Sequence, residues 1–347
     1  MPLAWLRHAQ FLRFALVAIL ALAGSASAQQ PSSQELKLSV AVAPAFPLGA
    51  AAKAWGDAMA AAGDGRIDAK LHPGASLSNR DPAREFFALR DGAADLAVGS
   101  ALAWSAQMPG LAVYALPWIA PEPEDLAALV ASPEVAGELM RRAEADGVVL
   151  LAFAPLGHRS LATTARAVRA PADLAGLRVR ATGGPLVVDT LAAIGALPAA
   201  MSFQQAQDAL AAGRLDGQEG LATSFVAARM PANGYRQLLR WGAFGDAMVF
   251  AVRRPVWDAW TDAQRRTALD TARRTAASAN APAREDAAER ELVAQGMGEA
   301  KLTRAGHEAF AAAAASVRTL RVPPIGAELV AAAERVVESS RAARSAR

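Results

Sequence analysis

Cationic and amide side chains gather in the second half of the chain, where they could bind an acidic small molecule. They are Arg159, Arg166, Arg178, Arg180 and Gln218. Arg180 is the most informative, because it ends a strand-like segment just before residues 182–185, Thr-Gly-Gly-Pro, and open α/β sheets bind ligands at such strand ends. A guanidinium there offers a planar fork of donors that matches a carboxylate. The alternative is a solvated arginine that alternates with Leu177 and Val179.

The sequence carries none of the common catalytic or metal-binding motifs. Apart from His8, the histidines are His72, His158 and His307, which are far apart and lack metal-ligand spacing. His-Glu-x-x-His, Gly-x-Ser-x-Gly, a P-loop and Gly-x-Gly-x-x-Gly are missing. The chain has no cysteine, which excludes disulfides, thiolate metal sites and a catalytic thiol. We therefore expect no enzyme, no metal and no cofactor, although a catalytic site built from distant residues stays open.

Strand-like and helix-like segments alternate along the chain, which is typical of an α/β fold with largely parallel sheets. Alternating residues over 36–42 predict a first strand, and apolar residues at helical spacing over 48–62 predict a helix. A second strand over 66–72 and a helix that begins at Asp81-Pro82 follow. A short apolar strand over 95–99 completes this first unit.

A short phrase then occurs twice in the chain. Residues 88–95, ALRDGAAD, and 209–216, ALAAGRLD, share Ala-Leu, Gly and Asp at identical offsets. Ser202 and Gln205 form a capping box before the second copy. Chance is one explanation, since helix-glycine-strand junctions are common. Because the strand before each copy also ends in a Gly/Pro-rich break, we favour two equivalent α/β lobes.

Two further segments connect these lobes. A hydrophobic strand is predicted over 148–154, after which the chain crosses near 155–157. A capping box at Thr261 and Gln264 opens a long helical stretch that can brace both lobes, with Pro282 as a kink or break. The expected boundaries are 34–155 with about 247–285 for lobe I, 156–246 with about 286–338 for lobe II, and 339–347 for a frayed tail.

Length and charge narrow the class of protein. The 347 residues suggest roughly two domains, and the 53% hydrophobic content excludes a disordered or collagen-like chain. The net charge of +3 is spread along the sequence without a block of Lys and Arg. Nucleic acid is therefore not an expected partner.

The first 28 residues have the features of a secretory signal. Arg7 and Arg13 precede an apolar run over 14–23, and Ala26-Ser27-Ala28 is the small-residue pattern at which signal peptidases cut. A membrane anchor is the alternative, but the run is shorter than the ~20 residues of a spanning helix and no stop-transfer cluster follows. We expect cleavage after Ala28, which removes two positive charges and lowers the net charge from +3 to +1.

Several motifs resemble a known family when taken in order. The second half contains PLGHR, PADLAGLRVR, GALP and ALAAGRLDGQEG within 155–220, and the first half contains GRIDAKLHPGASLSNRD, ALRDGAADLAVGS and LPWIAPE. Together, over about 38–300, they resemble the solute-binding proteins of tripartite ATP-independent periplasmic (TRAP) transporters, of the dicarboxylate-binding type. Several motifs in the same order are more specific than any single one.

The resemblance implies roles for individual residues. Arg180 matches the arginine that pairs with the ligand carboxylate, and Arg159 matches a frequent second basic contact. Phe203 matches an aromatic residue that packs near the arginine. Gln218 and Glu219 match the Gly-Gln-Glu turn of the family pattern.

The chain departs from that pattern at Gly220. The family usually continues with Asn-Pro, whose Asn bonds the ligand, whereas this chain has Gly-Leu and so lacks one side-chain donor. Phe46, Ser100 and Trp104 fall at strand-end positions that line the cleft in relatives, and Trp241 lies in the segment that crosses back between the lobes. For these residues ordinary packing is an equally acceptable interpretation.

The resemblance also implies a fold and a function. We expect a two-lobed periplasmic-binding-protein fold, each lobe a mixed, mostly parallel sheet flanked by helices. The protein is expected to be periplasmic and monomeric, to close its lobes on a small organic acid, and to deliver this acid to the permease subunits of a TRAP transporter in the membrane. The alternatives are the binding protein of an ATP-driven transporter, an exported sensor component and an exported enzyme.

Overall fold

The computed structural model describes residues 34–63, 67–181, 184–201 and 203–346. The predicted signal segment 1–28 and Ser202 of the predicted capping box lie outside these residues. From Glu35 onward the chain forms one compact unit. No helix in the described ranges combines the length and the apolarity needed to cross a bilayer.

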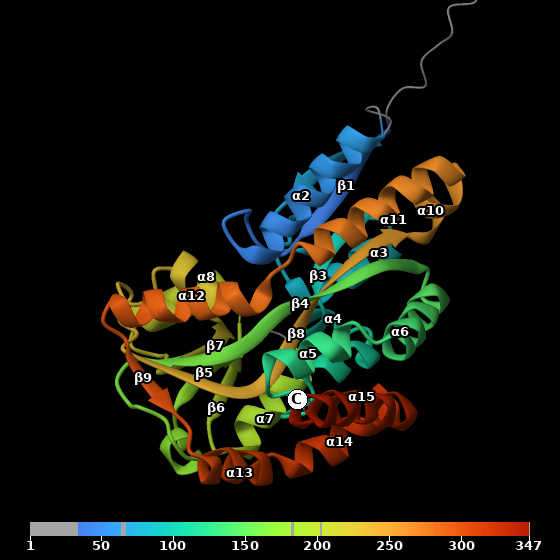
Figure 1. Ribbon diagram of the computed structural model, residues 1–347. Helices are drawn as coiled ribbons and strands as arrows, with labels where there is room; N and C mark the ends of the chain where they lie inside the picture. Colours follow the sequence, from blue (N-terminus) through green and yellow to red (C-terminus); the bar gives the residue numbers. More distant parts are fainter. Residues whose placement is uncertain (1–33, 64–66, 182–183, 202, 347) are drawn as a thin grey trace, which may run out of the picture. The chain divides into compact units, whose positions relative to one another are not determined.

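Nine strands of the described residues form one mixed sheet (Figure 1), in the order β2-β1-β3-β8-β4-β7-β5-β6, with β9 beside β8. The α/β prediction is confirmed, but the two parallel parts, β1 with β3 and β5 with β6 and β7, belong to one sheet because the antiparallel strands β4 and β8 join them. The strands are β1 (Gln34–Val40), β2 (Ile67–His72), β3 (Leu96–Ser100), β4 (Val148–Thr163), β5 (Arg178–Ala181), β6 (Leu197–Ala200), β7 (Gly217–Leu221), β8 (Gln237–Arg253) and β9 (Gly298–Lys301).

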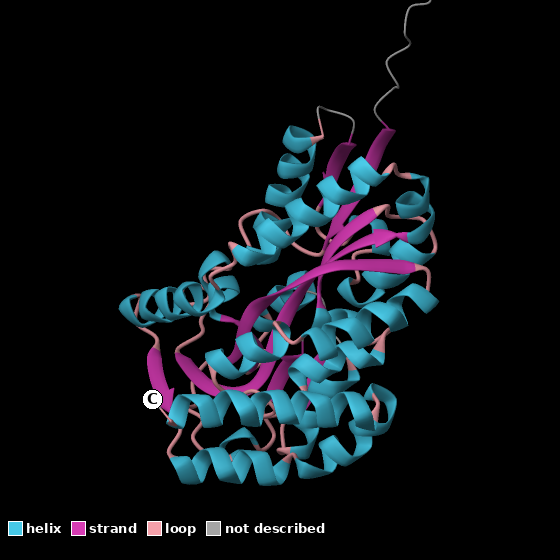
Figure 2. Ribbon diagram, turned by 45° about the vertical axis from the view of Figure 1, so that its right-hand side comes forward, coloured by secondary structure: helices cyan, strands magenta, loops and turns pink. Residues whose placement is uncertain are grey.

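Helices cover both sides of this sheet (Figure 2). The α-helices of the described residues are α2 (Pro47–Ala62), α3 (Glu85–Arg90), α4 (Ala101–Trp104), α5 (Pro123–Val130), α6 (Pro133–Ala145), α7 (Pro185–Ala193), α8 (Phe203–Ala211), α9 (Ala222–Ala227), α10 (Arg254–Ala259), α11 (Asp262–Ala277), α12 (Ala281–Ala294), α13 (Arg304–Ala313), α14 (Ala315–Ile325) and α15 (Ala327–Ser345).

The repeated phrase makes the same junction in both lobes. In each copy the glycine has a positive φ, 83° in the first and 64° in the second, and so ends its helix. The Asp95 carboxylate accepts a hydrogen bond from the Lys37 backbone N–H in β1 (2.9 Å), and Asp216 accepts one from the Arg178 N–H in β5 (2.9 Å). The two lobes therefore share a local construction around the parallel pairs β1/β3 and β5/β7.

Two long strands carry the chain between the lobes. β4 has 16 residues and β8 has 17, and their pairing shifts register between Pro155 and Gly157, where we expected the chain to cross. Gly157 has φ of +136°, which side chains rarely adopt, and a Cβ there would lie 2.9 Å from Glu285 Cγ. The crossing is therefore an irregularity inside a continuous strand. The lobe boundaries stay a prediction, since the described residues pack as one unit.

The predicted brace consists of two helices. The capping box at Thr261 and Gln264 starts α11, and Pro282 lies in the first turn of α12, after a break at 278–280. α11 packs on α2, α12 packs on α9, and both contact β4. The pair therefore contacts elements of both lobes (orange in Figure 1).

The C-terminal segment differs from the frayed tail that we expected. α15 continues to Ser345 and packs on α5 and α6. The buried Asp125 carboxylate of α5 accepts hydrogen bonds from Arg341 Nε (2.9 Å) and Arg344 Nη2 (2.5 Å). These partners lie more than 200 residues away in sequence, so local composition gave no sign of them.

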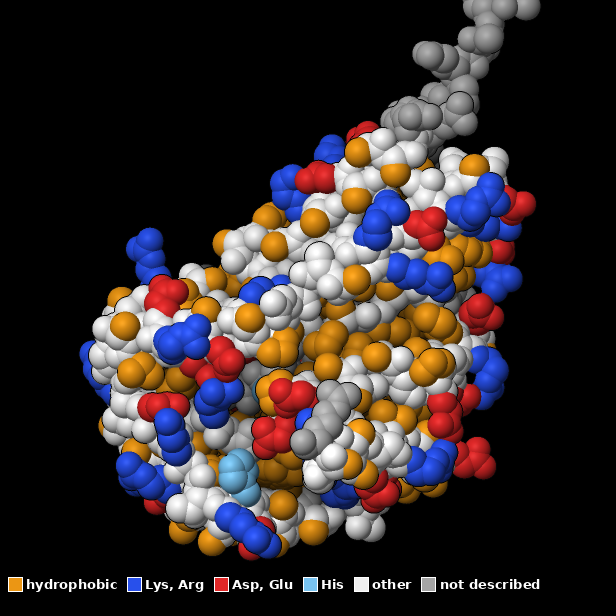
Figure 3. All heavy atoms as spheres, in the orientation of Figure 1, with side chains coloured by type: hydrophobic (Ala, Val, Ile, Leu, Met, Phe, Trp, Pro, Cys, Tyr) orange, Lys and Arg blue, Asp and Glu red, His pale blue; other side chains and the backbone are white. Residues whose placement is uncertain are grey.

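On the face of the molecule shown in Figure 3, acidic and basic side chains are interspersed.

Candidate functional site

Arg180 is the penultimate residue of β5 and is 7% exposed. Its Nε donates a hydrogen bond to the Met201 carbonyl oxygen (3.1 Å), in the segment that leads to α8. Burial lowers its pKa to about 10, with the Glu219 carboxylate opposing and Arg159 adding to the shift. The group therefore stays charged at neutral pH, and a buried cation of this kind favours an anionic partner.

Two neutral polar groups accompany Arg180. Gln218 is its direct partner in the β5/β7 pair, so both side chains leave the same face of the sheet. Gln218 is 3% exposed, and its Oε1 has no hydrogen-bond partner. Tyr235 is fully buried, and its hydroxyl also lacks a partner. Burial raises the pKa of Tyr235 to about 12, against the attraction of Arg180.

Phe225 explains how the structure accommodates the departure at Gly220. Gly220 lies two residues after Gln218 in β7 and therefore on the same face. A Cβ added to Gly220 would lie 2.8 Å from Cε1 of the buried Phe225 ring. The aromatic ring thus occupies the space into which the family's Asn side chain would extend. This part of the site is apolar where the family pattern has an amide.

Arg159 belongs to a buried ion network. Its Nε donates to the Glu219 carboxylate, and its Nη1 donates to Asp246 Oδ2 (3.1 Å). Asp246 also accepts hydrogen bonds from Ser100 Oγ (2.7 Å) and the Leu102 N–H (3.2 Å). Burial alone disfavours the charged guanidinium, but the two carboxylates hold the pKa of Arg159 above its ordinary value. The network joins β7, β4 and β8 to the end of β3 and to α4.

In this network Arg159 and Ser100 form ion pairs and hydrogen bonds within the protein that the sequence did not predict. Ser100 caps α4, because its Oγ accepts the Ala103 N–H (3.1 Å), and it binds Asp246 at the same time. Both guanidinium contacts of Arg159 that the structure describes go to protein carboxylates. A direct contact between Arg159 and a ligand stays a prediction.

The predicted aromatic residues lie in different surroundings. Phe46 is half-buried and lines a groove of about 600 Å³ together with Gln207 of α8 and Asn233. Trp104 is fully buried against Gly99, and its indole N–H donates to Glu85 Oε2 (3.2 Å), so the structure places it in core packing. The side chain of Phe203, which begins α8, lies outside the described part of the chain.

Trp241 lies in the wall of a second cavity of about 300 Å³. Its indole N–H donates to the Arg159 carbonyl oxygen (2.9 Å), and its ring meets Phe244 edge-on with centroids 5.7 Å apart. Figure 3 shows the hollowed face, with acidic side chains and a histidine at the rim. Glu289 in this wall forms an ion pair with Arg240 (2.8 Å) and accepts a hydrogen bond from Ser160 Oγ (3.3 Å). Burial raises the pKa of Glu289 to about 7.

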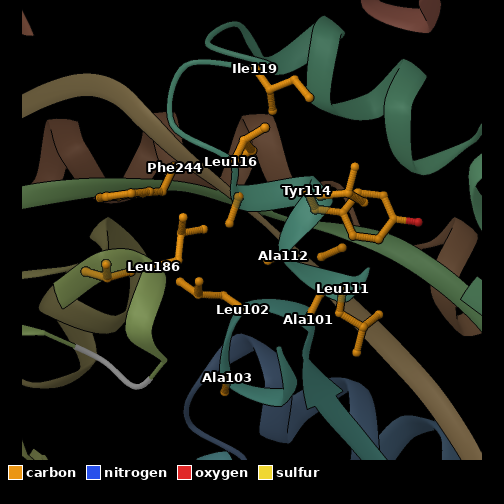
Figure 4. Packing of buried hydrophobic residues seen from close by; sticks show 14 of the residues in the cluster. Ala101, Leu102, Ala103, Leu111, Ala112, Tyr114, Leu116, Ile119, Leu186 and Phe244 are labelled. Carbon is orange, nitrogen blue, oxygen red and sulfur yellow. The ribbon is translucent and has the colours of Figure 1, made fainter. Parts of the chain in front are cut away.

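Helix α4, which directly follows β3, contacts the second lobe. Figure 4 shows Leu102 of α4 beside Leu186 of α7. A Cβ added to Gly184, at the start of α7, would lie 3.3 Å from the Leu102 carbonyl oxygen. The strand ends of the two lobes therefore meet near the network that includes Asp246.

The described residues contain no cluster of three or more His, Cys, Asp or Glu able to hold a metal ion.

Sequence reasoning did not assign Tyr235, Phe225 or Asp246 to the site. Asp246 had a visible signal, because it is the only charged residue in the otherwise apolar run 241–252. Tyr235 is one of only two tyrosines in the chain, which alone says nothing about its neighbours. Phe225 could be connected with Gly220 only through the fold of β7 and α9.

Comparisons with known proteins agree with one family. The sequence model of the bacterial extracellular solute-binding proteins, family 7, matches residues 38–319. A TRAP periplasmic solute-binding protein from Ralstonia eutropha, solved with bound (S)-2-acetolactate, is 36% identical, with a TM-score of 0.84 over 88% of this chain and 99% of that one. The C4-dicarboxylate-binding periplasmic protein of Rhodobacter capsulatus is 28% identical over 68% of this chain and 70% of that protein.

Other relatives align over shorter stretches. The chain spans 34%, 48% and 53% of the length of three curated relatives, from Sinorhizobium fredii, Verminephrobacter eiseniae and Chromohalobacter salexigens. The fold also matches the sugar acid binding protein of Advenella mimigardefordensis in complex with galactonate, at a TM-score of 0.81 and 16% identity over 88% of this chain and 98% of that one.

Proposed function

Because the chain belongs to the bacterial extracellular solute-binding proteins of family 7, the periplasmic binding proteins of TRAP transporters, we propose that it captures a small organic acid and delivers it to a TRAP permease. The observation that carries this proposal is Arg180, a buried and charged guanidinium at a strand end beside the orphan oxygen of Gln218. The 36% identical relative with bound 2-acetolactate supports a small carboxylate as the ligand class.

The ligand carboxylate pairs with Arg180 in this mechanism. A charge-assisted pair contributes about 1.5–3 kcal/mol, more when it is bidentate. Such a pair drives closure only if the closed state binds the ligand more tightly than the open state. The irregular segment of β4 at Pro155 and Gly157 is suited to absorb a hinge movement, since its pairing with β8 is already shifted there.

The same proposal includes the export, the location and the partners of the protein. Residues 1–28 are removed on export with cleavage after Ala28, and the mature protein works in the periplasm as a monomer. Its partners are the ligand and the membrane permease, and it binds its ligand without turnover and without a cofactor. Arg159 stays a predicted second contact, which requires its guanidinium to be shared with Glu219 and Asp246.

Isothermal titration with small acids tests the proposal. The panel contains 2-acetolactate, short hydroxy acids, their deoxy analogues and C4-dicarboxylates. We expect Arg180→Ala to weaken binding of the best acid by about 10- to 150-fold, which corresponds to about 1.5–3 kcal/mol. Arg178→Ala is the matched control, since Arg178 lies two residues earlier in β5 and pairs at the surface with Asp216. Wild-type affinity in Arg180→Ala, with the fold intact by circular dichroism, contradicts the assigned role.

A further inference from the structure

The cavity of about 300 Å³ at the crossing of β4 and β8 is distinct from the surroundings of Arg180. One part of its wall is the first half of α12, and another part contains Gly157 of β4 and Trp241 of β8. Arg159 also borders it, whereas Arg180 and Gln218 do not. Its volume lies at the lower end of the range of small-molecule pockets. A small molecule therefore fits here without occupying the proposed acid site.

Carboxylates outnumber cations in the described wall of this cavity. The four carboxylates of the wall are Glu122, Glu285, Asp286 and Glu289. Of the two guanidinium groups in the wall, that of Arg159 is already matched by Glu219 and Asp246. Arg240 is thus the remaining guanidinium of the described wall that can offset the four carboxylates. A hollow with an excess of negative charge attracts cations.

Glu289 is a buried carboxylate of this wall whose hydrogen bonds are incomplete. It is 8% exposed, and its Oε1 accepts a hydrogen bond from Ser160 Oγ (3.3 Å). Its Oε2 lies 2.8 Å from Arg240 Nε but receives no hydrogen bond from the described residues. Arg240 is half-exposed and also pairs with Asp286 (3.0 Å). Because buried polar atoms are normally hydrogen-bonded, Oε2 of Glu289 points to a further donor inside the cavity.

The groups around Glu289 favour a bound cation. Burial raises the pKa of Glu289 to about 7, with the neighbouring Glu285 and Asp286 adding to the shift and Arg240 opposing it. His158 donates from Nε2 to a backbone carbonyl oxygen (2.7 Å), and burial lowers its pKa, so its ring is neutral at pH 7. A cation beside Glu289 would stabilise the ionised carboxylate that its surroundings now disfavour.

We propose that this cavity binds a short aliphatic amine in its ammonium form. The ammonium group donates to Glu289 Oε2 and is attracted by Glu285 and Asp286, since it carries three donors and a compact positive charge. The alkyl part packs against the proline and leucine side chains of the wall, which are Pro121, Pro123, Leu126, Pro155 and Pro282. A metal ion fits less well, because the described residues lack a cluster of three His, Cys, Asp or Glu that could hold one.

Isothermal titration with 1,4-diaminobutane at low ionic strength tests this inference. The neutral control is 1,4-butanediol, in which hydroxyls replace the ammonium groups. We expect the wild-type protein to bind the diamine at least about tenfold more tightly than the diol, because charge-assisted hydrogen bonds are the stronger ones.

The variant Glu289→Gln removes the charge at nearly constant volume. We expect it to bind the diamine at least about tenfold more weakly than wild type, and its melting temperature without ligand shows whether the fold is kept. Asp286→Asn, at a half-exposed position of the same wall, should weaken binding by about threefold. Glu291→Gln is the matched control with wild-type affinity, since Glu291 is an exposed residue of α12 outside the wall.

The pH dependence identifies Glu289 as the carboxylate that binds the amine. Between about pH 6 and about pH 8 the diamine stays protonated, whereas a carboxyl with a pKa of about 7 changes from about one tenth to about nine tenths ionised. We expect the affinity to rise about tenfold over this range in wild type and less than about threefold in Glu289→Gln. The other carboxylates of the wall are present in both proteins, as are His158, Arg159, Arg240 and His307.

The outcomes separate this inference from the proposed function. Arg180→Ala should bind the diamine like wild type, and Glu289→Gln should bind the best acid like wild type, because the two residues belong to different sites. Failure of wild type to bind the diamine, equal binding of the diol, or wild-type affinity in Glu289→Gln overturns the amine site and leaves the acid site in place. Displacement of the diamine by an equal concentration of Na⁺ also overturns it, since simple screening then explains the binding. Loss of acid binding alone contradicts the proposed function.

Discussion

Glu85 is a carboxyl group buried in the first lobe with neutral partners. Its Oε1 lies 2.7 Å from Ser39 Oγ, and its Oε2 accepts the Trp104 indole N–H at 3.2 Å. Burial raises its pKa to about 7, and the two hydrogen bonds only partly oppose this shift. A protonated carboxyl fits the same geometry, because it can donate to Ser39 and still accept from Trp104.

We expect Glu85 to make the protein less stable as the pH rises from 5 to 7. The folded state holds a proton that the unfolded state, with an ordinary pKa of 4.5, has released, so stability is lost through this window and then becomes constant. The difference between about 7 and 4.5 corresponds to about 3 kcal/mol at most. Urea unfolding of Glu85→Gln, whose amide mimics the protonated acid, should show a flatter pH profile.

An exposed glutamate of the same lobe provides the control for this measurement. Glu35→Gln removes a surface carboxylate that pairs weakly with Lys70 (3.5 Å), and it should retain the wild-type pH profile. The same slope in Glu85→Gln as in wild type contradicts a raised pKa for Glu85.

At the residue scale, sequence identified groups whose chemistry is local. The position of Arg180 at a strand end before a glycine-rich turn was visible in a few consecutive residues, and the structure places it there. The partners Asp246 and Tyr235 were not visible, because their approach to Arg159 and Arg180 depends on how β8 passes the second lobe. Residues distant in sequence are joined only by the complete fold.

At the scale of elements, the helix signals were largely reliable. The Asp81 cap and the capping box at Thr261 appear where expected, because both are contacts within a few residues. The end of the chain was predicted poorly, since the contact that holds it is the distant carboxylate of Asp125. Composition alone cannot reveal such a partner.

Asp125 is therefore expected to anchor the last turns of α15. We expect Asp125→Asn to raise amide hydrogen exchange at least about tenfold over 338–345, because Arg341 and Arg344 lose a shared anionic acceptor. Hydrogen exchange monitored by mass spectrometry measures this. Glu124→Gln, an exposed neighbour in α5, should leave the segment protected. Unchanged exchange over 338–345 in Asp125→Asn contradicts the anchoring role.

At the scale of the whole molecule, the main difference from expectation is the number of sheets. We expected each lobe to have its own mixed, mostly parallel sheet, and the parallel pairs are present in both lobes. β4 and β8 connect them by antiparallel pairing along most of their lengths. Strand periodicity tells which residues face the core, but it does not tell which strands become neighbours, so this union could not be predicted from the sequence.

The continuous sheet leads to an expectation for unfolding. Because β4 and β8 contribute to the core of both lobes, neither lobe can lose its strands without disturbing the other, and calorimetry should give one cooperative transition. An acid at a hundredfold excess over its Kd adds about 2.7 kcal/mol, which for a chain of this size raises the Tm by about 4 °C. Arg180→Ala should keep the single transition and lose the ligand-dependent rise. Two separate transitions in the ligand-free protein would show that the lobes unfold independently in spite of their shared strands.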